Sequence, residues 1–271
     1  MTGTVKVQGQ PQVVAHRGAS ADFAEHTVGA YRSALEAGAE ALECDVRLTA
    51  DGHLVCVHDR RIDRTSDGHG AVSALPLEQL RQRDFKSWKQ PTVEGEVTME
   101  GDRPGSVLTF EELCAIVRDW HRPVQLAVET KHPTRFGSLV ERRLVRTLGR
   151  FGWDKAPTEG PPPVRVMSFS RTALRRLHER APEVPTVYLM DRTLLVHRDG
   201  SLPLGTRIAG PGIHILRAHP KYVRRAHDKG HEVHVWIVNE TADLLLCQRL
   251  GVDAVITDRP AEAARLFQAH G

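Results

Sequence analysis

Hydrophobic runs along this chain are short, and they alternate with segments in which apolar residues recur at helical spacing. Short runs separated by amphipathic helices are typical of βαβ units that build a parallel sheet. We expect strands at residues 13–18, 41–46, 125–130, 164–169, 186–190, 213–217, 233–238 and 254–258. These eight strands, each followed by a helical segment, predict an α/β fold, a (β/α)8 TIM barrel. A doubly wound open sheet is the alternative that strand counting leaves open.

Polar residues indicate where some of the helices begin and end. Thr109 with Glu112, and Ser138 with Glu141, have the spacing of a capping box. Gly251 follows a helical segment, and we expect it to end that helix.

The second expected strand leads into "RLTADGHLVCV", residues 47–57. Its Asp-Gly pair lies between two strand-like halves, which predicts a β-hairpin. With a two-residue turn at Asp51 and Gly52, Asp45 would lie opposite His58. The residues that follow, up to 108, are rich in Gly, Pro and charge. Loops of such length are usually functional, so we expect an inserted segment after the second strand.

Length and composition favour one large domain. The chain has 271 residues, and we expect one barrel domain over 12–268, with the inserted segment at 59–108 and a tail at 1–11. The net charge of +3 is spread along the chain and does not argue for nucleic acid. The four cysteines form no C-x-x-C pair, which indicates reduced, buried thiols. No apolar run approaches the ~18 residues of a membrane span. We therefore expect a soluble, cytoplasmic protein without stable membrane insertion.

Three acids fall near the ends of two expected strands. Residues two apart in a strand share a face, so Glu43 and Asp45 should point together. Glu129 and Lys131 repeat this spacing at the end of the third strand. The C-terminal strand ends of a barrel form its active-site rim, and three carboxylates there favour a hard divalent cation, Mg²⁺ or Ca²⁺. The competing interpretation is a set of structural ion pairs, such as Glu129 with Lys131.

The remaining candidate groups suit an anionic ester. Arg17 can grip a phosphate with its fork, and Lys131 adds a point charge. Two histidines near one metal site, His16 and His58, can share the proton transfers. Trp236 either packs in the core or walls a substrate pocket. The chain has no G-x-S-x-G and no P-loop, which weakens esterase-triad and kinase interpretations.

Taken in order, the motifs resemble the glycerophosphodiester phosphodiesterase family from about residue 13 to residue 260. The likeness lies in "AHRG", "AEHT", "GAEALECDVRLTADGHLVCVHD", "RT" at 64–65, "VETK", "SF" at 168–169, "WIVN" and "ITDRP". The family is a (β/α)8 barrel with an inserted segment after the second strand, in agreement with the strand count. The resemblance implies a phosphoric diester hydrolase that converts glycerophosphodiesters to sn-glycerol 3-phosphate and an alcohol.

The resemblance also implies a role for each candidate residue. The ligands of one divalent cation would be the three acids Glu43, Asp45 and Glu129. The general acid–base pair would be His16 and His58. The substrate-binding residues would be Arg17, Lys131 and Trp236. One departure concerns the family's usual Glu-Asn-Thr, where this chain has His26 in place of Asn. We expect this histidine to change the donors beside the site and so to affect metal or substrate choice.

Three other functions remain open on this barrel. A lysophospholipase D or a sphingomyelinase D-like lyase would need an apolar rim for acyl chains. A glycosidase would use Glu43 and Glu129 as its carboxylate pair. A non-catalytic binder of a phosphate ligand would lack one of the acid–base histidines. The expected partner is a small-molecule substrate, and the sequence does not indicate an oligomeric state.

Overall fold

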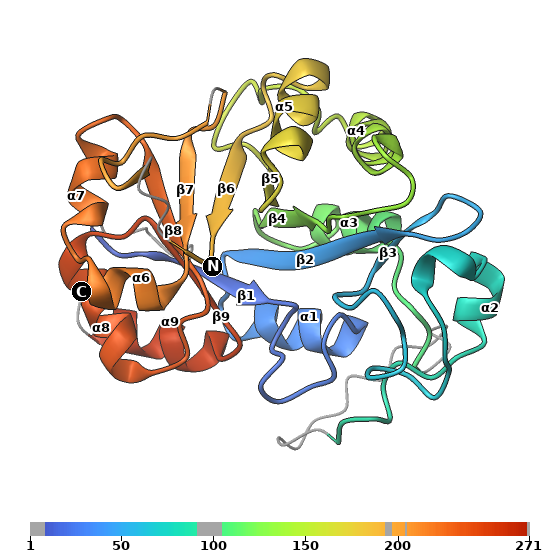
Figure 1. Cartoon of the computed structure of the whole chain (residues 1–271). Helices are drawn as coiled ribbons and strands as arrows, with labels where there is room; N and C mark the ends of the chain where they lie inside the picture. Colours follow the sequence, from blue (N-terminus) through green and yellow to red (C-terminus); the bar gives the residue numbers. More distant parts are fainter. Residues whose placement is uncertain (1–8, 91–104, 193–196, 204, 270–271) are drawn as a thin grey trace.

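The computed structural model describes residues 9–90, 105–192, 197–203 and 205–269, in which strands and helices alternate (Figure 1). The strands are β1 (Gln12–His16), β2 (Ala41–Leu48), β3 (Leu54–Cys56), β4 (Gln125–Thr130), β5 (Val164–Ser168), β6 (Thr186–Met190), β7 (Ile208–Pro211), β8 (Glu232–Val235) and β9 (Ala254–Thr257). The α-helices are α1 (Val28–Glu36), α2 (Leu77–Arg81), α3 (Phe110–Arg118), α4 (Leu139–Arg150), α5 (Arg171–Arg180), α6 (Ile213–Ala218), α7 (Tyr222–His227), α8 (Thr241–Leu250) and α9 (Pro260–Ala269). A short 3-10 helix, Val72–Ala74, precedes α2.

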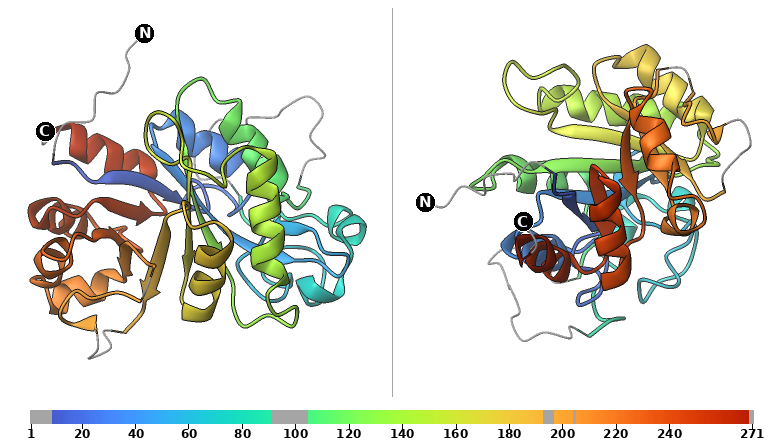
Figure 2. Two further views of the ribbon diagram at one scale, coloured as in Figure 1. Left: turned by 90° about the horizontal axis from the view of Figure 1, so that it is seen from above. Right: turned by 90° about the vertical axis from the view of Figure 1, so that its left-hand side faces the viewer.

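The parallel strands close on themselves. β1 pairs in parallel with β2 on one side and with β9 on the other, and the ring continues through β4, β5, β6, β7 and β8. β3 adds to the outer part of β2 in the antiparallel direction. Figure 2 shows the helices around the outside of the strands. The fold is a (β/α)8 TIM barrel with an inserted segment after the second barrel strand, as predicted, and the open-sheet alternative is excluded.

The sixth predicted strand is wrong. Residues 213–217 belong to helix α6, and the strand β7 lies just before it. Short apolar runs do not distinguish a strand from a buried helical segment. In α6, Ile215 and Leu216 are buried, whereas His214 and Arg217 face solvent. The strand itself, "IAGP", has little hydrophobic signal because its site admits only small residues: a Cβ at Gly210 would lie 2.8 Å from a methyl of Leu189.

The hairpin exists, but its predicted register is wrong by one residue. Thr49 N donates to His53 O at 2.9 Å, so the loop has three residues and ends at Gly52, whose φ of 82° is left-handed. Val57 N therefore donates to Asp45 O at 3.0 Å, and His58 follows one residue beyond. The Arg47 guanidinium fixes that next residue, because Nε and Nη2 donate to His58 O at 2.9 and 2.7 Å.

The predicted helix ends are partly confirmed. Thr109 and Glu112 form the capping box of α3, and Gly251, with φ 71°, ends α8. The box at Ser138 and Glu141 is wrong, because Ser138 makes no side-chain capping bond. Glu141 is buried instead, and its Oε1 lies 3.2 Å from Nε2 of His132.

The barrel interior has an apolar middle layer that supports the polar groups above it. Along β2, Leu42, Cys44 and Val46 pack outward in the layer beneath the helices. Ala41, Glu43 and Asp45 alternate with them and therefore face inward. The apolar layer consists of Val14, Ala41, Ala127, Met167, Val187, Leu189, Ile208, Ala254 and Ile256, with Trp236 packed against it.

Two further expectations concern cysteines and membranes. All four cysteines are buried and free, as predicted. Among the described residues, no helix has the length and apolar character that crossing a membrane requires. The division into one domain over 12–268 with a tail at 1–11 stays a prediction. Residues 1–8 of that tail and 91–104 of the inserted segment lie outside the described residues.

The opposite end of the barrel has a buried polar floor. Arg165 donates from Nη2 to Gln12 Oε1 at 2.9 Å, and Gln12 Nε2 lies 2.5 Å from Gln125 Oε1. His234 Nε2 lies 3.1 Å from Glu232 Oε2. Burial, with a smaller contribution from Arg165, lowers the pKa of the His234 imidazole to about 4.

This buried imidazole predicts a pH-dependent stability. The unfolded chain binds a proton at His234 near pH 6.5, whereas the native protein binds it only near pH 4. The unfolding free energy therefore carries no penalty from His234 above pH 6.5, and it decreases as the pH falls toward 4. Between about pH 7.5 and 5, His234→Gln should therefore reduce the fall in unfolding free energy by roughly 2 kcal/mol. Urea unfolding at a series of pH values measures this.

The matched control is His69→Gln, because the His69 side chain is 83% exposed. We expect the control to keep the wild-type pH dependence. An unchanged pH dependence in His234→Gln would contradict the assignment.

Candidate active site

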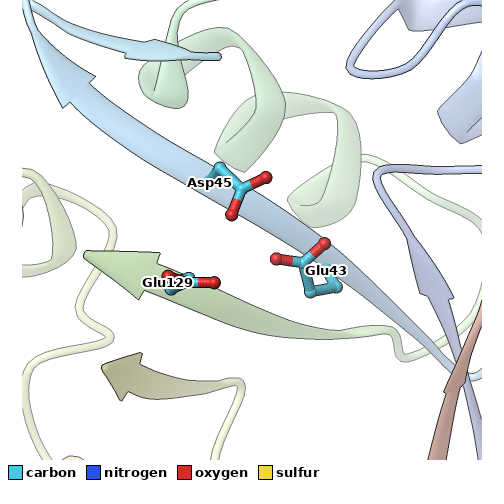
Figure 3. A group of neighbouring side chains, drawn as sticks. All are labelled: Glu43, Asp45 and Glu129. Atoms are coloured by element: carbon cyan, nitrogen blue, oxygen red, sulfur yellow. The ribbon is translucent and has the colours of Figure 1, made fainter. Parts of the chain in front are cut away.

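Three carboxylates meet at the C-terminal end of the barrel strands (Figure 3). Glu43 and Asp45 come from β2 and Glu129 from β4, and the strand register sets Asp45 beside Glu129. One oxygen from each acid lies within 4.8 Å of the others, and all three side chains are buried. The structure thus brings together the three acids that the sequence predicted would converge.

The charge balance of this acidic triad fits a divalent cation. Burial and repulsion by Asp45 raise the pKa of Glu43 well above its usual value and that of Glu129 to about 7. Although burial opposes it, Lys131, His26 and Arg17 hold the pKa of Asp45 well below its usual value. The neighbouring cations thus stabilise one ionised acid fully but not all three. An all-oxygen donor set with surplus negative charge suits a hard cation such as Mg²⁺ or Ca²⁺.

Lys131 lies within the triad. Its Nζ is 2.9 Å from Asp45 Oδ1 and 2.8 Å from Glu129 Oε2. The ion pair that we considered as a competing interpretation is therefore present. It does not replace the metal interpretation, because the pKa of Glu129 stays raised beside this ammonium.

Arg17 reaches the same acids from a tight turn after β1. Its φ is 56°, and its backbone N donates to Glu43 Oε2 at 3.0 Å. Its guanidinium Nε lies 3.1 Å from Asp45 Oδ2. Gly18 continues the turn with φ 88°, and a Cβ there would lie 2.6 Å from the carbonyl carbon of Ala30. The glycine of the "HRG" motif is thus required by close packing on α1.

His16 is held by a carboxylate at the end of the neighbouring strand, β9. Its Nδ1 lies 2.6 Å from Asp258 Oδ1, and its Nε2 is 3.9 Å from Glu43 Oε2. Asp258 in turn accepts from Ser20 Oγ at 2.8 Å and from Asn239 Nδ2 at 2.6 Å. Burial lowers the pKa of His16 despite the opposing effect of Asp258. This network directs Nε2 of His16 toward the triad.

His58, which follows the hairpin, is likewise held through Nδ1 by an aspartate. Its Nδ1 lies 2.7 Å from Asp59 Oδ1, which leaves Nε2 available for chemistry. Burial lowers the pKa of His58 to about 4. Asp59 is itself held by Arg64, whose Nε donates to Asp59 Oδ2 at 2.7 Å. Each predicted acid–base histidine is therefore oriented by an aspartate.

Four residues without a predicted role orient the two histidines: Asp59, Arg64, Asn239 and Asp258. Asp59 directly follows His58, and Asp258 ends the last predicted strand. The rule that selected Glu129, an acid at a strand end, would also have selected Asp258.

His26, the departure from the family pattern, contacts the acidic triad directly. It is buried in a left-handed conformation with φ 61°. Its Nε2 lies 3.0 Å from Asp45 Oδ2 and its Nδ1 lies 2.8 Å from the Tyr31 hydroxyl. Together with His58, Phe85 and Leu108, it lines a hollow beside the site. His26 thus contacts a triad acid directly, and its effect on metal or substrate choice stays a prediction.

Trp236 both supports the barrel interior and borders the rim. Its ring packs on the apolar middle layer, and its Nε1 donates to Gly210 O at 2.6 Å. Phe169, from the "SF" motif, meets the ring edge-on with centroids 5.5 Å apart. Phe169 is 45% exposed, so this aromatic pair forms an apolar wall open to solvent.

Known proteins resemble this chain over nearly its whole length. The profile of the glycerophosphoryl diester phosphodiesterase family matches residues 16–262. The probable glycerophosphodiester phosphodiesterase 1 of Mycobacterium tuberculosis is 45% identical over 253 residues, which are 93% of this chain and 90% of that protein. The glycerophosphodiester phosphodiesterase of Bacillus subtilis is 30% identical over 253 residues, 91% of this chain and 83% of that protein.

Solved structures show the same fold. A phosphodiesterase of Oleispira antarctica, in complex with the product sn-glycerol-3-phosphate, superposes with a TM-score of 0.80 at 24% identity, covering 96% of this chain and 97% of that one. A putative glycerophosphoryl diester phosphodiesterase from Silicibacter pomeroyi also gives 0.80 at 24% identity, covering 97% and 95%. From its sequence, barrel and acidic site, this chain belongs to the glycerophosphoryl diester phosphodiesterase family of enzymes.

Proposed function

We propose that this enzyme hydrolyses glycerophosphodiesters to sn-glycerol 3-phosphate and an alcohol with the help of one divalent cation. The observation that carries the proposal is the buried acidic triad with a carboxylate-held histidine on each side. The names of the relatives support the substrate class, and the product bound to the Oleispira antarctica phosphodiesterase supports the reaction.

The triad residues Glu43, Asp45 and Glu129 would hold the cation, and Mg²⁺ and Ca²⁺ fit an all-oxygen site. When bound, the cation supplies Lewis-acid polarisation of a phosphoryl oxygen. Arg17 and Lys131 would bind the phosphate through a guanidinium fork and an ammonium.

The two histidines would move the protons. His16 is the more enclosed, with 13% of its side chain exposed against 34% for His58. We assign His16 as the base that deprotonates the free glycerol hydroxyl, whose oxygen attacks phosphorus. His58, nearer to solvent, protonates the alcohol oxygen as its bond to phosphorus breaks. The negative charge of the bound phosphodiester would raise the lowered pKa of His58 and so favour its protonated form. Water then opens the cyclic phosphate. Trp236 would border the substrate pocket.

A release assay for sn-glycerol 3-phosphate tests this function. We expect at least one of glycerophosphocholine, -ethanolamine, -glycerol and -inositol to be hydrolysed. EDTA should reduce the rate by at least about a hundredfold, because the cation supplies several kcal/mol of stabilisation. Adding Mg²⁺, Ca²⁺ or Mn²⁺ in turn should restore the rate and identify the preferred ion.

Parallel assays on other substrates test the competing functions, which do not release sn-glycerol 3-phosphate. Lysophosphatidylcholine and sphingomyelin test the lipid phosphodiesterases, and an aryl glycoside with EDTA tests the glycosidase. Faster hydrolysis of either lipid, or chelator-insensitive glycoside hydrolysis, would replace the proposed substrate class. No metal-dependent release from any glycerophosphodiester would refute the proposal.

A further inference from the structure

Arg64, in the inserted segment, joins two carboxylates at the rim of the site. Its Nε donates to Asp59 Oδ2 at 2.7 Å. Its Nη1 and Nη2 donate to the two oxygens of Glu25 at 2.9 and 2.8 Å. Every nitrogen of the fork thus has a carboxylate partner, a geometry that lysine cannot reproduce.

Each of the two carboxylates that Arg64 binds also contacts a residue of the proposed mechanism. Asp59 Oδ1 lies 2.7 Å from Nδ1 of His58. Glu25 Oε1 lies 3.1 Å from Nη1 of Arg17. A continuous chain of charge-assisted hydrogen bonds therefore runs from the proposed acid to the proposed phosphate-binding arginine, with Arg64 at its centre. The hydrogen bond from Arg64 is also the main reason that the pKa of Asp59 falls to about 2.

The inserted segment holds Arg64 in this place. The guanidinium lies over the ring of Trp88, 5.8 Å from its centroid. The next residue, Lys89, donates from Nζ to the carbonyl of Ala21 at 2.8 Å and also to that of Ser20. The segment is thereby attached to the loop between β1 and α1, which contains Arg17.

The exposure of Arg64 indicates that this chain of hydrogen bonds orients side chains and adds little to the stability of the fold. The Arg64 side chain is 45% exposed, and exposed ion pairs stabilise proteins by only about 0–1 kcal/mol. Its two hydrogen bonds to Glu25 nevertheless fix the guanidinium, and the bond from Nε then constrains Asp59 in one rotamer beside His58. An unconstrained Asp59 can rotate, and the imidazole of His58 then loses its fixed direction.

We propose that Arg64 is a positioning residue for catalysis, which holds Asp59 so that Asp59 keeps Nε2 of His58 directed into the site. The inserted segment thus contributes to the reaction by fixing a proton-transfer group. This inference rests on the proposed role of His58.

The test compares two matched variants, Arg64→Gln and Arg61→Gln. Arg61 lies in the same segment and has a 59% exposed side chain. Among the acids that the structure describes, it bonds only to the exposed Asp63. We expect Arg64→Gln to lower kcat on the best glycerophosphodiester by about 10- to 100-fold, below the ~10²–10⁴-fold of acid–base catalysis itself. The cation Kd by calorimetry should change less than about threefold, because the triad is intact. KM should change as little, because Arg17 keeps its own bonds to Glu25 and Asp45. Arg61→Gln should keep the wild-type kcat.

A double-mutant cycle shows whether Arg64 acts through Asp59. If it does, Arg64→Gln combined with Asp59→Asn should be no slower than Asp59→Asn alone. Additive losses, a wild-type kcat in Arg64→Gln, or equal losses in Arg61→Gln would each overturn the inference. Full activity in His58→Ala would overturn the proposed role of His58 itself. If His58→Ala is inactive, any of the three outcomes above overturns only the role of Arg64.

Discussion

Replacing His16 or His58 with alanine is expected to lower kcat for glycerophosphodiester hydrolysis by about 10²–10⁴-fold, the contribution of a positioned acid or base. Each imidazole is tied through Nδ1 to an aspartate, Asp258 for His16 and Asp59 for His58. Neither is part of the acidic triad, so the cation Kd measured by calorimetry should stay near its wild-type value. Initial rates of sn-glycerol 3-phosphate release measure kcat.

A substrate with a p-nitrophenyl leaving group separates the two roles. Such a group departs without a proton, so it should restore much of the activity of His58→Ala but little of that of His16→Ala. The control is His53→Ala, because His53 lies at the tip of the hairpin and is 54% exposed. Full activity in both His16→Ala and His58→Ala would show that these histidines are not the acid–base pair. The opposite pattern of rescue would exchange their roles.

The acidic triad could be predicted from sequence because strand periodicity determines it. A period of two sets Glu43 and Asp45 on one face whatever the exact strand boundaries are. Parallel strands then bring Glu129 to the same end of the barrel. The hairpin position of His58 was less secure, because one additional loop residue shifts every pair in the register. Arg47 compensates by fixing the carbonyl of His58.

Asp258 lies at a predicted strand end as Glu129 does, but its pairing with His16 could not be predicted in this way. His16 and Asp258 are 242 residues apart in sequence, and they meet only because β1 and β9 close the ring. The strand β7 was missed for a related reason. Its residues carry little hydrophobic signal of their own, and they form a strand because β6 and β8 lie on both sides.

Replacing Glu129 with glutamine is expected to lower kcat by about a thousandfold, since the cation supplies several kcal/mol of transition-state stabilisation. The variant also has a readout that does not depend on turnover. At a cation concentration one hundred times Kd, the wild-type protein should gain about 2.7 kcal/mol of unfolding free energy. Glu129→Gln should gain much less at that concentration, because one of the three ligands has lost its charge. Thermal unfolding with EDTA or with Mg²⁺ or Ca²⁺ measures the difference.

The metal-free proteins should show the opposite order of stability. The pKa of Glu129 is raised to about 7 in the native protein, so the native state loses stability as the pH rises from 4.5 through 7 and the carboxylate ionises. In EDTA at about pH 8, Glu129→Gln should therefore be more stable than the wild type by up to roughly 3 kcal/mol, and this gain should vanish near pH 4.5. Glu36→Gln, at an exposed position at the end of α1, should behave as the wild type in both conditions. A cation-dependent gain that survives in Glu129→Gln would place the cation elsewhere. Loss of that gain without stabilisation of the metal-free variant would instead mean that the Lys131 ion pair already balances the charge of Glu129.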